Sequence, residues 1–311
     1  MLRHIAKVVV IVATLFFVVG AGFLLALPHY PALGLSWIWF RSSRPRQCDF
    51  GELARSAAYR QRFETVGQRV LSSSRLLQQD GDRQLWDIVG ARQFWLSAKH
   101  DVNGKLDLKQ ASAFAEQIAD QYYHPAVHMQ PGDIVLDVGA DHGDVTWKAL
   151  QAGAQKVVAI EIDPVKWDCL NRTFAPEIKD GRVVVVPMGV WDKEGTVELS
   201  GDSVIFDNHV TKKIVRVETI DQIVAELKLP KVDFVSMDIE GSEKPALRGA
   251  AQTLRRFHPR MAIASEHLSD DTTAIPETVR RMVPSYEVIC GQCAVKENFQ
   301  LVANVLWFRV P

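Results

Sequence analysis

The sequence has no marked excess of one charge, few cysteines and no internal repeats. Its 36 basic and 37 acidic residues leave a formal net charge of −1 over 311 residues. A nucleic-acid-binding surface needs a clear basic excess, so no nucleic-acid partner is expected. Four cysteines are too few for a disulfide scaffold. Because 47% of the residues are apolar, the chain has enough hydrophobic side chains for a sizeable core.

Charge is also absent from one long apolar run near the N-terminus. Residues 8–27 contain no charged side chain, and Pro28 follows them. A helix of about 20 residues spans about 30 Å, the hydrocarbon thickness of a bilayer. A cleaved signal peptide is the alternative, but its apolar core is shorter, about 7–15 residues. We expect a single-pass transmembrane helix over 8–27, followed by a juxtamembrane linker over 28–48.

Two regions with different patterns follow this segment. Residues 49–130 contain helical stretches at 50–77 and 107–121 with short strands around Gly90, and are expected to form an N-terminal extension. In residues 131–311, buried apolar runs alternate with helical segments, which is typical of a parallel sheet covered on both faces. We therefore predict an α/β domain with a doubly wound, mostly parallel sheet, whose ligand lies at the carboxyl ends of the strands.

The predicted strands and helices of this domain alternate with short loops. Strands are predicted at 133–139, 156–161, 182–187, 232–238 and 260–265, with late strands near 285–290 and 303–309. Helices are predicted at 143–152, 164–174, 219–227, 243–256 and 274–283.

The first predicted strand ends in a turn that contains two glycines. It places Asp137, Gly139, Ala140, Asp141 and Gly143 beside the expected ligand. A dinucleotide-binding turn has glycine where Asp141 stands, because an acidic side chain there repels a pyrophosphate. A ligand with a cationic sulfonium and amino group suits these carboxylates better. The alternative is a tight strand-to-helix turn that binds nothing.

The ends of the second and third strands extend this predicted site. Glu161 closes the second strand, where a carboxylate accepts hydrogen bonds from both hydroxyls of an adenosine ribose. Ile162 follows it, and Gly189 and Val190 follow the third strand; small and apolar side chains of this kind sandwich an adenine ring. Otherwise Glu161 is a solvated strand end.

Two later strands end in acidic or titratable side chains. Asp238 and Glu240 follow the fourth strand, and His267 follows the fifth. The carboxyl ends of neighbouring strands meet at one crevice, so these three are candidate catalytic residues. We expect the two carboxylates to orient a substrate that carries a hydroxyl group, and His267 to remove the proton of that hydroxyl. In one alternative, Asp238 or Glu240 is the base. In the other, alignment of the reacting groups is sufficient and no base is needed. In a non-catalytic reading His267 is a surface loop residue.

A metal site is not predicted. A metal ion would fit among Asp238, Glu240 and His267, but the sequence does not require one. Cys290 and Cys293 form a C-x-x-C pair without the second pair that a zinc site needs, so a structural or incidental role is expected.

With these motifs in view, residues 133–268 resemble the FkbM-type methyltransferases. The likeness rests on segments 137–143, 158–161, 189–192 and 217–221, and above all on Met237-Asp-Ile-Glu-Gly-Ser-Glu243 followed by residues 247–250. It departs from the family at Asp141, where members usually carry asparagine, and at Ser236, where lysine is frequent. These two departures put the identity of the acceptor in doubt more than that of the cofactor.

The resemblance implies a fold, a cofactor and a reaction. The fold is the seven-stranded class I methyltransferase sheet. The cofactor is S-adenosyl-L-methionine, and the reaction is methyl transfer, usually to a hydroxyl of a sugar, lipid or polyketide-like acceptor. A small molecule or glycolipid is thus the expected partner. Because this cofactor is made in the cytosol, the catalytic domain of a membrane-anchored protein is expected to face the cytoplasm. A nucleotide- or nicotinamide-dependent enzyme and a catalytically silent binding module remain as alternatives.

Overall fold

A seven-stranded sheet forms the centre of the structure, a computed structural model that describes residues 31–42, 48–199, 213–296 and 300–311. Neighbouring strands pair in parallel except at β13, which runs antiparallel to both of its neighbours. The order across the sheet is β12 (Glu287–Val295), β13 (Leu301–Arg309), β11 (Arg260–Ala264), β10 (Phe234–Met237), β4 (Ile134–Val138), β5 (Lys156–Ile160) and β6 (Val183–Val186).

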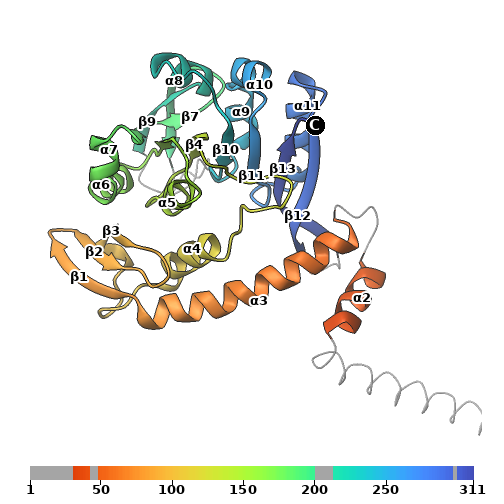
Figure 1. Cartoon of the computed structure of the whole chain (residues 1–311), viewed down its shortest axis with the longest axis horizontal. Helices are drawn as coiled ribbons and strands as arrows, with labels where there is room; N and C mark the ends of the chain where they lie inside the picture. The colour runs from red at the N-terminus through yellow and green to blue at the C-terminus, as the bar shows by residue number, and fades with distance from the viewer. Residues whose placement is uncertain (1–30, 43–47, 200–212, 297–299) are drawn as a thin grey trace, which may run out of the picture.

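The central strands are buried on both faces because their side chains alternate between two apolar layers. In β4, Leu136 and Val138 pack in one apolar cluster and Val135 in the other. Helices cover both faces of the sheet (Figure 1). These helices are α5 (Asp144–Gln151), α6 (Pro164–Thr173), α7 (Ala175–Lys179), α8 (Ile220–Glu226), α9 (Glu243–Arg248), α10 (Ala251–Phe257) and α11 (Asp271–Met282).

The predicted α/β organisation with a mostly parallel sheet is confirmed, with two local differences. The helix expected over 243–256 is divided into α9 and α10 at Gly249. A Cβ atom on Gly249 would lie 2.1 Å from the backbone oxygen of Trp191, so the chain packs too closely there for any other residue. A small second sheet was not predicted; it contains β7 (Gly189–Val190), β8 (Gly195–Leu199) and β9 (Lys213–Glu218).

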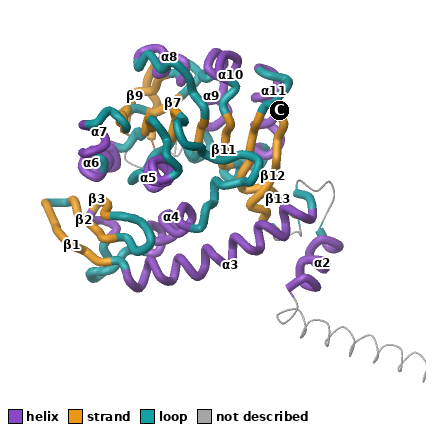
Figure 2. Tube along the Cα trace, viewed as in Figure 1, coloured by secondary structure: helices purple, strands orange, loops and turns teal. Residues whose placement is uncertain are grey.

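The N-terminal extension lies along one side of the α/β domain (Figure 2). Its long helix α3 (Phe50–Ser73) leads to a three-stranded antiparallel sheet of β1 (Arg75–Asp80), β2 (Arg83–Asp87) and β3 (Gln93–Ser97). A short 3-10 turn, Ala98–His100, and helix α4 (Leu108–Ile118) follow. The predicted linker over 28–48 is corrected, since Pro31–Arg41 forms helix α2 and packs against α3. Trp39 meets Phe50 there with ring centroids 5.8 Å apart.

A disulfide joins the start of this extension to the far edge of the central sheet. Cys48 and Cys293 are bonded across 245 residues of sequence. The Ser56 hydroxyl of α3 accepts a hydrogen bond from the Cys293 backbone N–H at 2.7 Å. The sequence did not predict this pairing, because Cys48 lies far from Cys293 along the chain. Cys290, the other member of the C-x-x-C pair, is a free thiol.

The described residues contain no helix that is both long enough and apolar enough to cross a bilayer. The 11 residues of α2 are too few, since about 20 are needed. The 24 residues of α3 include several charged side chains. This finding contradicts the predicted single-pass membrane location with a domain facing the cytoplasm, which is therefore withdrawn. The segment over 8–27, predicted as the transmembrane helix, itself lies outside the described residues.

Replacing Cys48 by serine is expected to destabilise the protein. The bond closes a very long loop, and loss of a disulfide typically costs about 2–4 kcal/mol of unfolding free energy. Denaturant unfolding of the oxidised protein measures this difference. Cys290→Ser is the matched control and should lower the unfolding free energy by less than Cys48→Ser does, since Cys290 is a free thiol. Equal stability of Cys48→Ser and wild type under oxidising conditions would contradict the role given to this bond.

Candidate active site

A cavity of about 480 Å³ opens at the carboxyl ends of β4, β5 and β10. Helix α4 of the extension supplies part of its wall. Most of the side chains proposed from the sequence line this one cavity: Asp137, Gly139, Asp141, Glu161, Ile162, Gly189, Val190, Asp238, Glu240 and His267. Ala140 and Gly143 are not among its lining residues, and Ala140 is buried behind the turn.

The two turn glycines are required for different reasons. Gly139 has φ +85°, and a Cβ atom there would lie 1.9 Å from the backbone oxygen of Asp238. It therefore allows the loops after β4 and β10 to touch. Gly143 has φ +95°, and a Cβ atom there would lie 2.3 Å from the Phe174 ring. Helix packing therefore requires glycine at this position, and the contact of Gly143 with a ligand stays a prediction.

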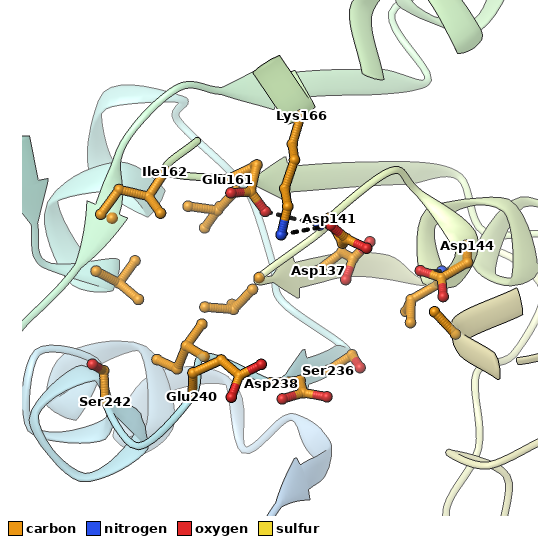
Figure 3. Close-up of a pocket in the computed structure, with 18 of the residues that line it drawn as sticks. Asp137, Asp141, Asp144, Glu161, Ile162, Lys166, Ser236, Asp238, Glu240 and Ser242 are labelled. Carbon is orange, nitrogen blue, oxygen red and sulfur yellow. Dashed lines mark hydrogen bonds and ion pairs between the residues drawn. The ribbon is translucent and has the colours of Figure 1, made fainter. Parts of the chain in front are cut away.

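The charge of Asp141 is neutralised within the protein. Its carboxylate lies 2.7 Å from the Lys166 ammonium and 3.2 Å from Nδ1 of His142. Figure 3 shows Lys166 reaching between Asp141 and Glu161. Burial raises the pKa of Asp141, but the charges of His142 and Lys166 outweigh burial and hold that pKa well below its usual value. Asp141 is thus ionised and paired, and adds little net charge beside the cavity.

Glu161 is buried and fixed at the end of β5. Its Oε2 atom accepts from the Asp141 backbone N–H at 2.9 Å, and Oε1 accepts from the Asp163 N–H at 2.7 Å. Burial raises its pKa, and Asp141 adds to the rise. A carboxylate offers about four lone-pair positions, so Glu161 keeps acceptor capacity toward the cavity.

Asp137 lines the cavity but is almost completely buried. It is 1% exposed, and its carboxylate accepts a hydrogen bond from the Thr146 hydroxyl at 2.5 Å. Burial raises the pKa of Asp137 to about 7, although the Thr146 hydrogen bond opposes the rise. Its contacts tie β4 to α5.

An apolar slot lies next to Glu161. Ile162 follows the carboxylate, and Gly189 and Val190 form β7 opposite it. A Cβ atom on Gly189 would lie 2.5 Å from Cδ1 of Ile162, so glycine sets the separation of these two segments. Met188 and Val217 complete this apolar part of the lining.

The three predicted catalytic residues meet on the opposite side of the cavity. Nε2 of His267 lies 3.4 Å from Asp238 Oδ1 and 3.5 Å from Glu240 Oε2. On its other face, Nδ1 lies 3.0 Å from Oε1 of Glu243, which is fully buried. The imidazole is therefore held between carboxylates on both of its nitrogen atoms.

This arrangement bears on the role expected for His267. Burial lowers its pKa, but the hydrogen bond to Glu243 and the charges of Asp238 and Glu240 outweigh burial and raise the pKa to about 9. An imidazolium has no lone pair with which to take a proton. The contacts therefore favour the rival hypothesis, in which a carboxylate is the base, while the base role of His267 stays a prediction.

Asp238, Glu243 and His267 also place ligand atoms within 4.8 Å of one another, close enough to hold a metal ion. Oε1 of Glu243, however, already accepts from the backbone N–H groups of Ile239 and Gly241 at 3.0 and 3.4 Å, as well as facing His267. These contacts give Glu243 a structural role.

Several residues around the site were not proposed from the sequence, among them Lys166, Glu243, Glu116 and Tyr122. Lys166 lies in the first turn of α6 and Glu243 in the first turn of α9. A charged side chain soon after the end of a predicted strand is a sequence feature by which both residues could have been predicted. Glu116 and Tyr122 come from the extension, and nothing in the local sequence links them to β10. Only the packing of α4 brings them to the cavity.

Comparison with known protein families identifies the domain. Residues 137–286 match the model of the methyltransferase FkbM domain. The chain thus carries an FkbM methyltransferase domain, as its motifs predicted, and the seven-stranded sheet with one reversed strand agrees with a methyltransferase fold. A search of curated proteins gives no match.

Several solved structures are similar at low identity. A methyltransferase FkbM from Methylobacillus flagellatus is 19% identical, with 82% of this chain and 60% of that chain covered and a TM-score of 0.45. The present chain thus spans about 60% of that protein's length. A putative methyltransferase from Streptococcus mutans, solved in complex with SAH, is 12% identical, with 59% and 91% covered and a TM-score of 0.39.

The pKa of His267 gives a prediction for stability. A histidine whose pKa rises on folding stabilises the protein fully below its unfolded pKa of about 6.5 and loses that contribution as the pH rises through about 9. We expect His267→Gln to lower the unfolding free energy more at pH 6 than at pH 10, measured by denaturant titration. His258→Asn, at an exposed position, is the control for replacing a histidine and should change the unfolding free energy by no more than about 0.5 kcal/mol. An equal loss for His267→Gln at both pH values would contradict the imidazolium assignment.

Proposed function

We propose that this methyltransferase uses S-adenosylmethionine and transfers its methyl group to a hydroxyl of a small-molecule acceptor such as a sugar or glycolipid. The observation that carries the proposal is the two-sided cavity. Figure 3 shows Glu161 and Asp141 on one side and Asp238 and Glu240 on the other. One side offers a carboxylate beside an apolar slot, and the other offers carboxylates at the end of the neighbouring strand.

The residues present fit the cofactor. Glu161 has acceptor capacity for ribose hydroxyls, and Ile162 and Val190 present apolar surfaces to an adenine ring. Because Lys166 compensates Asp141, the negative charge on this side of the cavity is reduced, which suits a cofactor with both cationic and anionic groups. When bound, S-adenosylmethionine would supply an electrophilic methyl group on a sulfonium; the acceptor oxygen would attack that methyl carbon, and S-adenosylhomocysteine would leave as a neutral thioether.

On the other side, Asp238 is placed to take the proton that the acceptor hydroxyl loses. Burial raises the pKa of Asp238 above its usual value, although His267 and the Tyr122 hydroxyl lower it in part. A carboxylate with a raised pKa is a stronger base than an ordinary aspartate. Glu240 lies beside it and offers a second acceptor for hydroxyl groups. Alignment of the acceptor with the methyl group supplies much of the remaining rate.

The cofactor assignment is tested by calorimetry with S-adenosylhomocysteine. The protein is expected to bind this product, and Glu161→Ala should weaken binding by about 1.5–3 kcal/mol, the usual worth of a hydrogen bond to a charged group. Glu64→Ala, at an exposed position of α3, is the control and should bind normally. Binding of NADH together with no binding of S-adenosylhomocysteine would overturn the assignment.

The catalytic assignment is tested by methyl transfer from labelled S-adenosylmethionine into sugar and glycolipid extracts. Once a product is found, Asp238→Asn is expected to lower turnover by about 10²–10⁴, the contribution of a positioned base, while S-adenosylhomocysteine affinity stays within about threefold. Asp180→Asn, at an exposed position after α7, should be unaffected. Near-normal turnover in Asp238→Asn would remove that carboxylate from the catalytic residues. Label found on nitrogen would refute the hydroxyl acceptor.

A further inference from the structure

The N-terminal extension supplies side chains to the methyl-transfer site. Helix α4 lies between α3 and the α/β domain (Figure 1). Lys109, Ser112 and Glu116 of α4 line the cavity, as does Tyr122 just after it. Since these residues precede the FkbM domain match, which begins at residue 137, the extension adds a wall that the matched domain does not provide.

Tyr122 makes the most direct contact between this wall and the strand ends. Its hydroxyl donates a hydrogen bond to Oδ2 of Asp238 at 2.8 Å across 116 residues of sequence. Its side chain is only 6% exposed. Its backbone carbonyl accepts a hydrogen bond from the Trp307 indole at 3.3 Å, which fixes the segment against β13. The next residue, Tyr123, is 52% exposed.

The two oxygens of Asp238 are therefore held by two different parts of the chain. Oδ2 accepts from Tyr122, and Oδ1 faces Nε2 of His267 at 3.4 Å. This contact from both sides fixes the plane of the carboxylate. Four further acidic side chains also act on Asp238 or His267: Glu116, Glu240, Glu243 and Glu266.

We propose that Tyr122 is a positioning residue of the methyl-transfer site, whose hydroxyl holds Asp238 ionised and oriented toward the acceptor. The extension thereby completes the active site of the FkbM domain. The role in methyl transfer rests on the proposed function, but the hydrogen bond between Tyr122 and Asp238 can be tested without knowing the acceptor.

The physical reason is the surplus of negative charge. Burial and the charges of Glu243 and Glu240 favour the neutral form of Asp238, whereas a hydrogen bond donated to its oxygen favours the ionised form. Tyr122 is well suited to this task, because burial and the nearby charge of Asp238 raise its own pKa well above the usual value. It therefore keeps its proton and remains a donor throughout the working pH range.

Tyr122→Phe removes the donor and keeps the ring. The Asp238 carboxylate should then no longer be held 3.4 Å from Nε2 of His267, and the attraction that raises the pKa of His267 should weaken. We expect the pKa of His267, followed by NMR of ¹³C-histidine-labelled full chain, to fall by about one unit. His267→Gln assigns the resonance. Tyr123→Phe is the matched control and should leave this pKa unchanged. An unchanged pKa in folded Tyr122→Phe would overturn the proposal.

A double-mutant cycle separates positioning from a general structural role. In an Asp238→Asn background the donor no longer has a carboxylate to stabilise, so adding Tyr122→Phe should leave the pKa of His267 unchanged. A shift as large as in the wild-type background would mean that Tyr122 acts by another route and would overturn the proposal. Residues in one hydrogen-bonded network have non-additive effects of this kind, and the cycle measures them.

A second measurement covers the case in which Tyr122→Phe does not fold. In protein with ¹³C-labelled tyrosine Cζ, Asp238→Asn should move the Tyr122 resonance and leave that of Tyr123 in place; no movement at Tyr122 would overturn the contact. Wild-type calorimetry with S-adenosylhomocysteine keeps the two hypotheses apart. Failure to bind it refutes the proposed function, whereas failure of the coupling refutes only the role of Tyr122.

Discussion

The carboxylate of Glu243 joins three segments on which the acceptor side of the cavity depends. It is fully buried, and Oε1 accepts from the backbone N–H groups of Ile239 and Gly241 while facing Nδ1 of His267. The first two contacts fix the loop after β10, and the third fixes the loop after β11. Because a buried carboxylate is costly unless it is hydrogen-bonded, these loops are held in one arrangement. Asp238 and Glu240 project from the loop held in this way.

Charge is distributed differently on the two sides of the cavity. Near β4 and β5, the Lys166 ammonium compensates the Asp141 carboxylate at 2.7 Å. Near β10 and β11, His267 is surrounded by several carboxylates and compensates only part of their charge. The first side is suited to a cofactor whose own charges are mixed. The second is suited to a reaction that releases a proton, since an aspartate with a raised pKa is available to receive it.

The extension is bound to the domain at both ends of its long helix. Near the start of α3, the disulfide from Cys48 and the Ser56 hydroxyl engage Cys293 in β12. Beyond its other end, β3 packs on α6, where Arg83 pairs with Asp168 at 2.8 Å. These two attachments restrain helix α4, which lies between α3 and the α/β domain. They therefore also keep Tyr122 in contact with Asp238. A hydrogen bond between distant segments is effective only if both partners are already held in place.

The sequence alone determined the α/β order, the strand ends and the class of domain. Strands and helices could be predicted because the period and length of an apolar run depend on neighbouring residues. The class of domain could be predicted because the turn from Asp137 to Gly143 and the acidic loop after β10 are each contiguous in sequence. Tertiary structure alone decided which distant groups meet. The link from Cys48 to Cys293 and the contact of Tyr122 with Asp238 depend on how α3 and α4 pack, which no local pattern encodes. The same holds for the charge of His267, because its pKa depends on carboxylates that approach it only in the folded chain.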